Sequence, residues 1–133
     1  MTRTILYLDD EAACLQLFVD LLGGHFEVRT AHTLAEARAL LAERPAEIVI
    51  SDQLMPGIDG TEFLREVAEK YPASCRVLLT GTVTFGNVMH QLGNGTVQFF
   101  LTKPWSEQEM RALLERAGAQ LEASARSRTI AHS

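Results

Sequence analysis

The 133-residue sequence lacks long hydrophobic runs and clusters of lysine and arginine. Its longest apolar stretches, such as Ile5–Leu8 and Phe99–Leu101, fall far short of the ~20 residues that a membrane-spanning helix requires. Lysine and arginine together number 12 against 17 aspartates and glutamates, which leaves a net charge of −5. Nucleic acids and anionic membrane surfaces both select clustered basic residues. We therefore expect neither direct nucleic-acid binding nor membrane association.

Cysteine is also scarce. The two cysteines, Cys14 and Cys75, stand among apolar neighbours and have no paired spacing, which argues against a disulfide framework. We interpret both as reduced core residues. No signal peptide precedes the first apolar run. These features predict a cytoplasmic location.

The length and the 47% apolar content suit one domain with one hydrophobic core. Five short runs rich in apolar residues predict strands. They are Ile5–Leu8, Phe26–Ala31, Ile48–Ile50, Arg76–Leu79 and Val97–Leu101. Each run is followed by apolar residues at helical spacing, and the fourth such helix is marked by Phe85, Val88, Met89 and Leu92. Strict alternation of strand and helix predicts an α/β fold with a parallel sheet and helices on both faces.

The helix ends also carry local signals. Two segments have the spacing of a capping box, Thr33 with Glu36 and Ser106 with Glu109. We expect Gly23–Gly24 to end the first helix in a left-handed conformation. The apolar period of the last helix stops after Leu121, so we expect a domain over residues 1–121 and a frayed tail or linker over residues 122–133.

Polar side chains follow four of the five predicted strands. In an open parallel sheet, ligands bind outside the carboxyl ends of the strands. The residues at those ends are Asp9, Asp10, Glu11, Asp52, Thr80 and Lys103. Clustered carboxylates repel one another and are costly to bury unless a cation neutralises them. Oxygen ligands of this kind predict a Mg²⁺ site that shares its ion with phosphate oxygens.

The same residues suit phosphoryl transfer. An aspartate beside the metal ion can attack phosphorus and form an acyl phosphate. The metal ion, the Lys103 ammonium and the Thr80 hydroxyl would then each hold one of the three equatorial phosphoryl oxygens. Each position alone has an ordinary structural explanation, such as a helix start for Asp9–Glu11 or a turn for Asp52. The hypothesis rests on four motifs that fall in order at four strand ends.

These motifs resemble the receiver domain of two-component response regulators over roughly residues 3–121. The segments that carry the resemblance are Leu8–Glu11, Asp52–Gly60, Thr80–Gly81 and Lys103–Pro104. The resemblance implies a doubly wound (βα)5 flavodoxin-like fold with strand order 2-1-3-4-5. It also implies a phosphoacceptor switch that catalyses only its own phosphorylation and dephosphorylation.

The resemblance assigns roles to the acidic residues. Asp52 would be the phosphoacceptor and a direct Mg²⁺ ligand, and Asp10 the second direct ligand. Asp9 would support the metal ion through water, and the backbone carbonyl of Leu54 would be a further ligand.

Phosphoryl binding and switching would fall to residues on the last two strands. The resemblance places Thr80, Gly81 and Lys103 around the phosphoryl group, with a cis peptide bond between Lys103 and Pro104. It makes Thr80 and Phe100 the switch pair. Phe100 is equally well explained as a plain core aromatic residue.

The resemblance further implies a sensor histidine kinase as phosphoryl donor and an output domain or effector protein as target. The surface of the fourth helix, fifth strand and fifth helix would change on phosphorylation, and it is a candidate homodimer interface.

Other functions stay open at this point. One is a degenerate receiver that signals without phosphate as a protein-interaction module. Another is a flavodoxin-like FMN-binding module, suggested by the hydroxyl-rich segment Thr80–Thr84. A third is an aspartyl-phosphate hydrolase, which would need an acid where Leu54 stands.

Overall fold

The computed structural model describes residues 2–55, 57–81, 90 and 93–132. The helix expected around Phe85, Val88, Met89 and Leu92 therefore lies outside the described residues. Within the described part, no helix is both long and apolar enough to cross a membrane.

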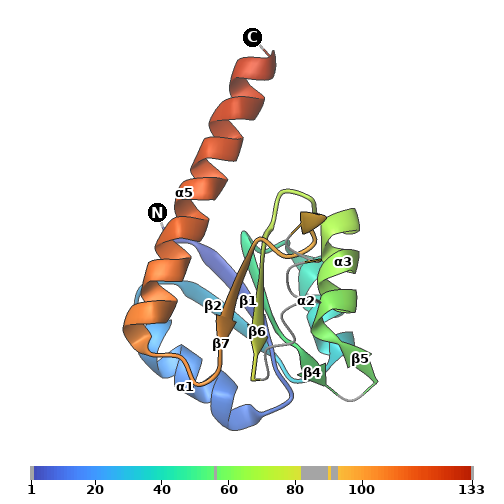
Figure 1. The fold of residues 1–133 in the computed structure, drawn as a ribbon, viewed down its shortest axis with the longest axis vertical. Coiled ribbons are helices and arrows are strands. Elements are labelled where there is room, and N and C mark those ends of the chain that lie inside the picture. Colours follow the sequence, from blue (N-terminus) through green and yellow to red (C-terminus); the bar gives the residue numbers. More distant parts are fainter. Residues whose placement is uncertain (1, 56, 82–89, 91–92, 133) are drawn as a thin grey trace.

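Five parallel strands form the central sheet (Figure 1). They are β1 (Thr4–Leu8), β2 (Glu27–Ala31), β3 (Ile48–Asp52), β6 (Cys75–Thr80) and β7 (Phe99–Thr102). Their order is β2-β1-β3-β6-β7, which in chain order is 2-1-3-4-5. The predicted doubly wound (βα)5 fold is confirmed. Its chain order reverses between β1 and β3, the place where this class of fold binds ligands.

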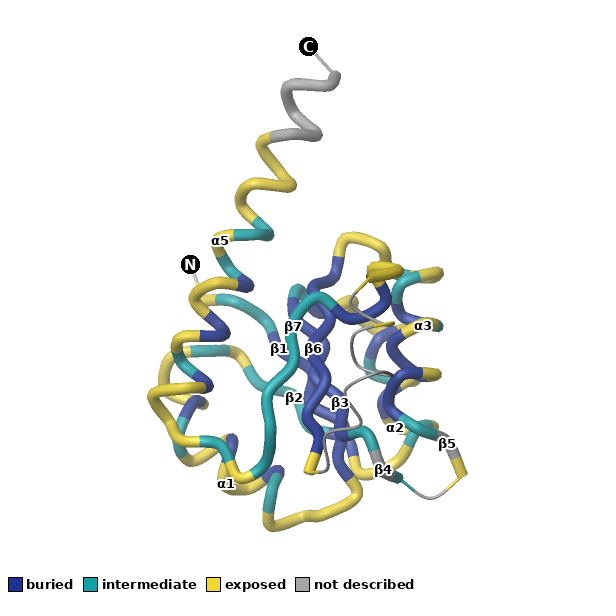
Figure 2. The backbone as a smooth tube through the Cα atoms, in the orientation of Figure 1, coloured by how far each residue is buried: buried dark blue, intermediate teal, exposed yellow. Residues whose placement is uncertain are grey.

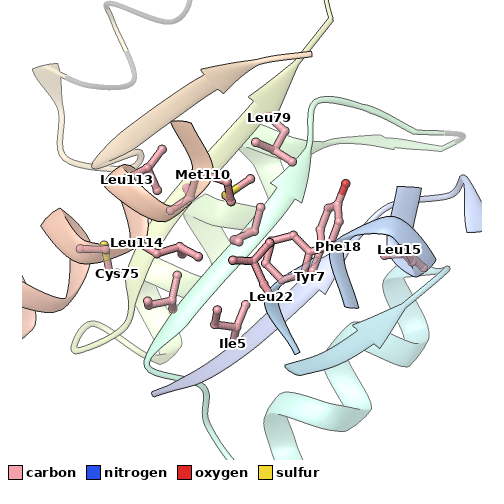
Figure 3. Packing of buried hydrophobic residues seen from close by; sticks show 14 residues of the cluster. Ile5, Tyr7, Leu15, Phe18, Leu22, Cys75, Leu79, Met110, Leu113 and Leu114 are labelled. Atoms are coloured by element: carbon pink, nitrogen blue, oxygen red, sulfur yellow. The ribbon is translucent and has the colours of Figure 1, made fainter. Parts of the chain in front are cut away.

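Helices cover both faces of the sheet. They are α1 (Ala12–Leu22), α2 (Leu34–Glu43), α3 (Gly60–Lys70) and α5 (Glu107–His132). Because strand side chains alternate between faces, Ile5 and Tyr7 enter the core under α1 and α5, and Leu6 and Leu8 enter the core under α2 and α3. Figure 3 shows the first of these cores, in which the Tyr7 and Phe18 rings pack together.

A short antiparallel hairpin follows the third strand of the sheet. It consists of β4 (Leu54–Met55) and β5 (Ile58–Asp59), where the sequence indicated turns only. Gly57, between them, has φ +87°, a region that favours glycine. Gly60 begins α3 so close to β3 that a Cβ there would collide with the carbonyl oxygen of Asp52. The hairpin therefore brings the chain straight back onto the end of β3.

Both predicted helix caps form, and the cap at Ser106 is a complete capping box. Thr33 accepts a hydrogen bond from the Glu36 amide at 3.1 Å. Ser106 and Glu109 cap each other's amides at 3.0 Å. The prediction for Gly23 is wrong in one respect, because it has φ −63° and is right-handed. The Leu22 carbonyl instead accepts the amides of residues 25 and 26, which satisfies the helix end without a left-handed residue.

The last helix is longer than predicted. α5 continues through residues 122–132, where a frayed tail was expected. Figure 2 shows that this distal part is largely exposed as far as its burial is described. The apolar period stopped because packing against the sheet stops near Leu121, but helical propensity does not, since alanine is frequent there. Arg3 adds a tether by pairing with Glu122 at 2.8 Å.

Candidate functional site

The sheet brings the predicted site residues to one edge. Asp9 follows β1, Asp52 ends β3, Thr80 ends β6, and Lys103 follows β7. Parallel register aligns these ends, since Leu8 pairs with Ser51, Asp52 with Leu79, and Thr80 with Thr102. The arrowheads of β6 and β7 in Figure 1 point to this edge.

Three carboxylates converge there. Ligand oxygens of Asp9, Asp10 and Asp52 all lie within 4.8 Å of one another. Asp9 is 0% exposed and Asp52 is 6% exposed, whereas Asp10 is open to solvent. Two buried acids and one exposed acid therefore surround a point that a hydrated cation can reach.

Lys103 supplies a positive charge to this cluster. Its Nζ donates a hydrogen bond to Oδ2 of Asp9 at 2.8 Å and lies 3.4 Å from Oδ1 of Asp52. Burial alone would lower the pKa of Lys103, but the hydrogen bond and charge of Asp9 and the charge of Asp52 raise it above the usual value. Lys103 therefore stays charged between the two buried acids.

The Lys103 ammonium does not fully offset the cost of burying the negative charges of Asp9 and Asp52. Burial raises the pKa of Asp52, Lys103 opposes this shift, and the charge of Asp9 adds to it, so that the net direction is upward. The ionised form of Asp52 is thus disfavoured in the folded protein. A divalent cation at this point would remove that cost, so the residues present fit Mg²⁺.

The remaining predicted residues lie as follows. Thr80 is 2% exposed, and its backbone carbonyl accepts the Lys103 amide at 2.8 Å. Gly81 is exposed, and no atom of the described residues lies within 4 Å of the position that a Cβ would take. The Lys103–Pro104 peptide bond is cis. Phe100 is partly buried against the core under α2 and α3. The backbone of Leu54 pairs with Asp59 in the hairpin, and its side chain lies outside the described atoms.

A model of the response regulator receiver domain family matches residues 5–115. The chain belongs to this family. The receiver domain is 33% identical over 102 residues to the hydrogenase transcriptional regulatory protein HoxA of Cupriavidus necator, which covers 77% of this chain and 21% of that protein. It is 32% identical over 117 residues to the response regulator protein FleR of Pseudomonas aeruginosa, which covers 86% of this chain and 24% of that protein.

Solved structures agree with this membership. A response regulator receiver domain protein from Clostridium thermocellum has a TM-score of 0.84 and 28% identity, and the match covers 91% of this chain and 98% of that one. The chain spans only about a fifth to a quarter of the length of the two relatives HoxA and FleR.

Tyr7 belongs to the site of this receiver domain, and sequence reasoning missed it. Its hydroxyl donates a hydrogen bond of 2.6 Å to Oδ2 of Asp9, and the ring is 0% exposed. Burial and the hydrogen bond to Asp9 raise the pKa of Tyr7, so that it remains a donor. The signal was present in the alternation of β1, because residues two apart on a strand share a face.

The prediction that Cys14 is a core residue is wrong. Cys75 is a buried core residue as expected, but Cys14 is only partly buried and lies at the rim of the site. Its Sγ is 3.8 Å from Nζ of Lys103 and 3.8 Å from Oε2 of Glu11. Residues on the buried side of α1 enter the core, whereas Cys14 falls on the side that faces Lys103.

Proposed function

We propose that this receiver domain accepts a phosphoryl group on Asp52 from the phosphohistidine of a sensor histidine kinase. The observation that carries this proposal is the convergence of Asp9, Asp10 and Asp52 beside Lys103 at the carboxyl edge of the sheet. In the transfer step, a carboxylate oxygen of Asp52 bonds to phosphorus while the bond from phosphorus to the histidine nitrogen breaks. The imidazole leaves with the bonding electron pair.

Mg²⁺ is the cofactor that these residues suit. Asp10 and Asp52 would be its direct side-chain ligands, the Leu54 carbonyl a further ligand, and Asp9 a support through water. When bound, the ion neutralises the carboxylates and the charge of the transferred group. The exposure of Asp10 and the upward pKa shift of Asp52 support this assignment.

Residues of the chain itself then hold the phosphoryl group. The Lys103 ammonium already lies between Asp9 and Asp52, within reach of a group attached to Asp52. The Thr80 hydroxyl would donate to a second oxygen, and Gly81 adds no side chain that could crowd the phosphoryl group. These groups act by position and charge, so the domain is a phosphoacceptor switch and turns over no separate substrate.

Switching would follow from a shift in population between two states. Thr80 would move toward the phosphoryl group and Phe100 would rotate into the space beside it. Register supports this pairing, because Leu78 pairs with Phe100 and Thr80 lies two residues beyond on the same face. The surface that responds includes β7 and α5, together with the fourth helix, which lies outside the described residues.

The partners proposed are a histidine kinase and an output domain or effector protein. The matched relatives are named as regulatory proteins several times longer than this chain, which supports an output on the same or another polypeptide. We propose residues 1–121 as the receiver and residues 122–133 as the linker, with a cytoplasmic location. The face of the fourth helix, β7 and α5 is proposed as a homodimer interface.

The other candidate functions have less support. A phosphate-independent receiver would not need the acidic cluster and the ammonium together at one edge. A flavodoxin-like FMN site is not favoured, because Asp9, Asp10 and Glu11 occupy the loop after β1 where such modules hold a phosphate.

Intact mass measurement tests the proposed function. Incubation of the chain with Mg²⁺ and acetyl phosphate should add the mass of one phosphoryl group, and omission of Mg²⁺ should prevent this. Asp52→Asn should abolish the gain. Asp20→Asn, on the exposed side of α1, should leave it unchanged and serves as the matched control. A parent protein that gains no mass in the presence of Mg²⁺ would reject the proposal.

A further inference from the structure

Tyr7 places a hydroxyl group inside an apolar core. Its ring packs against Phe18 with centroids 5.0 Å apart, and Phe18 in turn packs against Trp105 at 6.0 Å. Figure 3 shows the Tyr7 ring within this core, with its oxygen at the outer end of the side chain. A phenylalanine would fill the same volume, and burying a hydroxyl is costly unless it forms a hydrogen bond. The partner it finds is Asp9, at 2.6 Å.

The Asp9 carboxylate uses most of its hydrogen-bond acceptor positions within the protein. Oδ2 accepts hydrogen bonds from the Tyr7 hydroxyl at 2.6 Å and from Lys103 Nζ at 2.8 Å. Oδ1 accepts the amide of Glu11 at 3.0 Å. A carboxylate offers about four acceptor positions, so the contacts among the described residues leave roughly one, and it belongs to Oδ1. Asp9 is therefore held in one orientation, with a single position left for a water molecule of the metal ion.

We propose that Tyr7 is a positioning residue for the Mg²⁺ site and acts through Asp9. Its hydroxyl and the Lys103 ammonium occupy Oδ2, so Oδ1 would be the oxygen left to hold a water molecule of the ion. Groups that orient metal ligands in this way typically contribute 10–100-fold to metal affinity. This inference rests on the proposed Mg²⁺-dependent phosphorylation and extends it to a residue in the hydrophobic core.

Isothermal titration calorimetry with Mg²⁺ on the Tyr7→Phe variant tests the inference. The substitution removes one oxygen atom and keeps the ring, and its fold is checked by circular dichroism. We expect the dissociation constant for Mg²⁺ to rise about tenfold. Tyr71→Phe is the matched control, because the other tyrosine of the chain follows α3 near Glu47, at the amino end of the strands. Its Mg²⁺ affinity should equal that of the parent.

Phosphorylation by acetyl phosphate provides a second measurement. In Tyr7→Phe, the Mg²⁺ concentration for half-maximal rate should rise about tenfold, while the rate at saturating Mg²⁺ stays within about twofold of the parent. A slower rate at saturation with an unchanged Mg²⁺ requirement would overturn the inference, as would an unchanged dissociation constant. If the variant alone is unaffected, the proposed function still stands. A parent chain that binds no Mg²⁺ would overturn both.

Discussion

Asp9 and Asp52 are both buried carboxylates, but the protein compensates them differently. Asp9 accepts three hydrogen bonds, from Tyr7, Glu11 and Lys103. Asp52 has the same ammonium at a longer distance of 3.4 Å, and burial raises its pKa. Asp52, the proposed phosphoacceptor, is thus the less stabilised of the two carboxylates, and it has the most to gain from a cation or from conversion to an acyl phosphate.

Asp52→Asn should therefore stabilise the protein in the absence of Mg²⁺. A raised pKa in the folded state means that ionisation of Asp52 costs stability above its ordinary pKa of 3.8, and the asparagine avoids this cost. We expect the free energy of unfolding at pH 7 to rise by an amount on the order of 1 kcal/mol. Urea unfolding at a series of pH values measures it.

The pH dependence supplies the control. The advantage of Asp52→Asn should be largest at neutral pH. It should shrink as the pH falls from the raised pKa toward 3.8, because the folded carboxyl becomes protonated first and the carboxyl of the unfolded chain follows. A variant that is less stable than the parent at pH 7, or an advantage that grows toward low pH, would contradict the argument.

The helix α5 continues well beyond the apolar residues that pack it against the sheet. Its first half buries an apolar stripe against the sheet, and its second half does not. Arg3 joins the two halves to the body of the domain. It contacts Glu47 at 2.7 Å, Glu122 at 2.8 Å and the carbonyl of Gly118 at 3.3 Å. The direction of the exposed half is therefore coupled to the start of β1.

Arg3→Met should loosen this coupling. The methionine keeps apolar bulk but loses three polar contacts, two of them charged. We expect the free energy of unfolding to fall by about 1–2 kcal/mol, reduced from the buried case because Glu122 is exposed. Hydrogen exchange should show faster exchange of amides 119–126 in the variant.

Arg44→Met is the matched control for this change. Arg44 pairs with Glu27 at 2.7 Å on the exposed surface, away from α5. Its loss should cost within about 0.5 kcal/mol and leave exchange in α5 unchanged. Equal effects of the two substitutions on α5 would show that the Arg3 contacts do not anchor the helix.

Element ends differed in how well local sequence predicted them. The helix caps at Thr33 and Ser106 formed as predicted because their hydrogen bonds join residues three apart. The extension of α5 beyond Leu121 was missed because the loss of the apolar period marks the end of packing, not the end of helical propensity. β7 begins at Phe99 and not at Val97. Next to this start, the Arg76 amide donates to the side-chain oxygen of Gln98 at 2.8 Å and not to a backbone carbonyl of the neighbouring strand.

At the scale of the whole molecule, the proposed Mg²⁺ site would link the stability of the receiver domain to the ion. An ion that binds the folded chain and not the unfolded chain stabilises it by about 2.7 kcal/mol at a hundred times its dissociation constant. The Asp9, Asp10 and Asp52 cluster exists only in the folded chain, because it joins residues from two separate strands.

Saturating Mg²⁺ should accordingly raise the Tm, by an amount on the order of 10 °C for a domain of this size. Asp10→Asn should remove most of this rise, and because Asp10 is exposed, the Tm without Mg²⁺ should change little. Differential scanning calorimetry measures both. An equal Mg²⁺ response in parent and Asp10→Asn would show that the ion binds elsewhere.

Sequence by itself determined the alternation of strands and helices, the parallel sheet and the polar residues at four strand ends, because periodicity and strand ends are local properties. Tertiary structure alone decided which atoms meet at the site. Lys103 reaches Asp9 across 94 positions and Cys14 across 89, and Arg3 reaches Glu122 across 119. No local pattern specifies such distances, since they follow from how the sheet and helices pack as one body. The contact between the Tyr7 hydroxyl and Asp9 differs from these, because the two residues are only two positions apart and the alternation of β1 places them on one face.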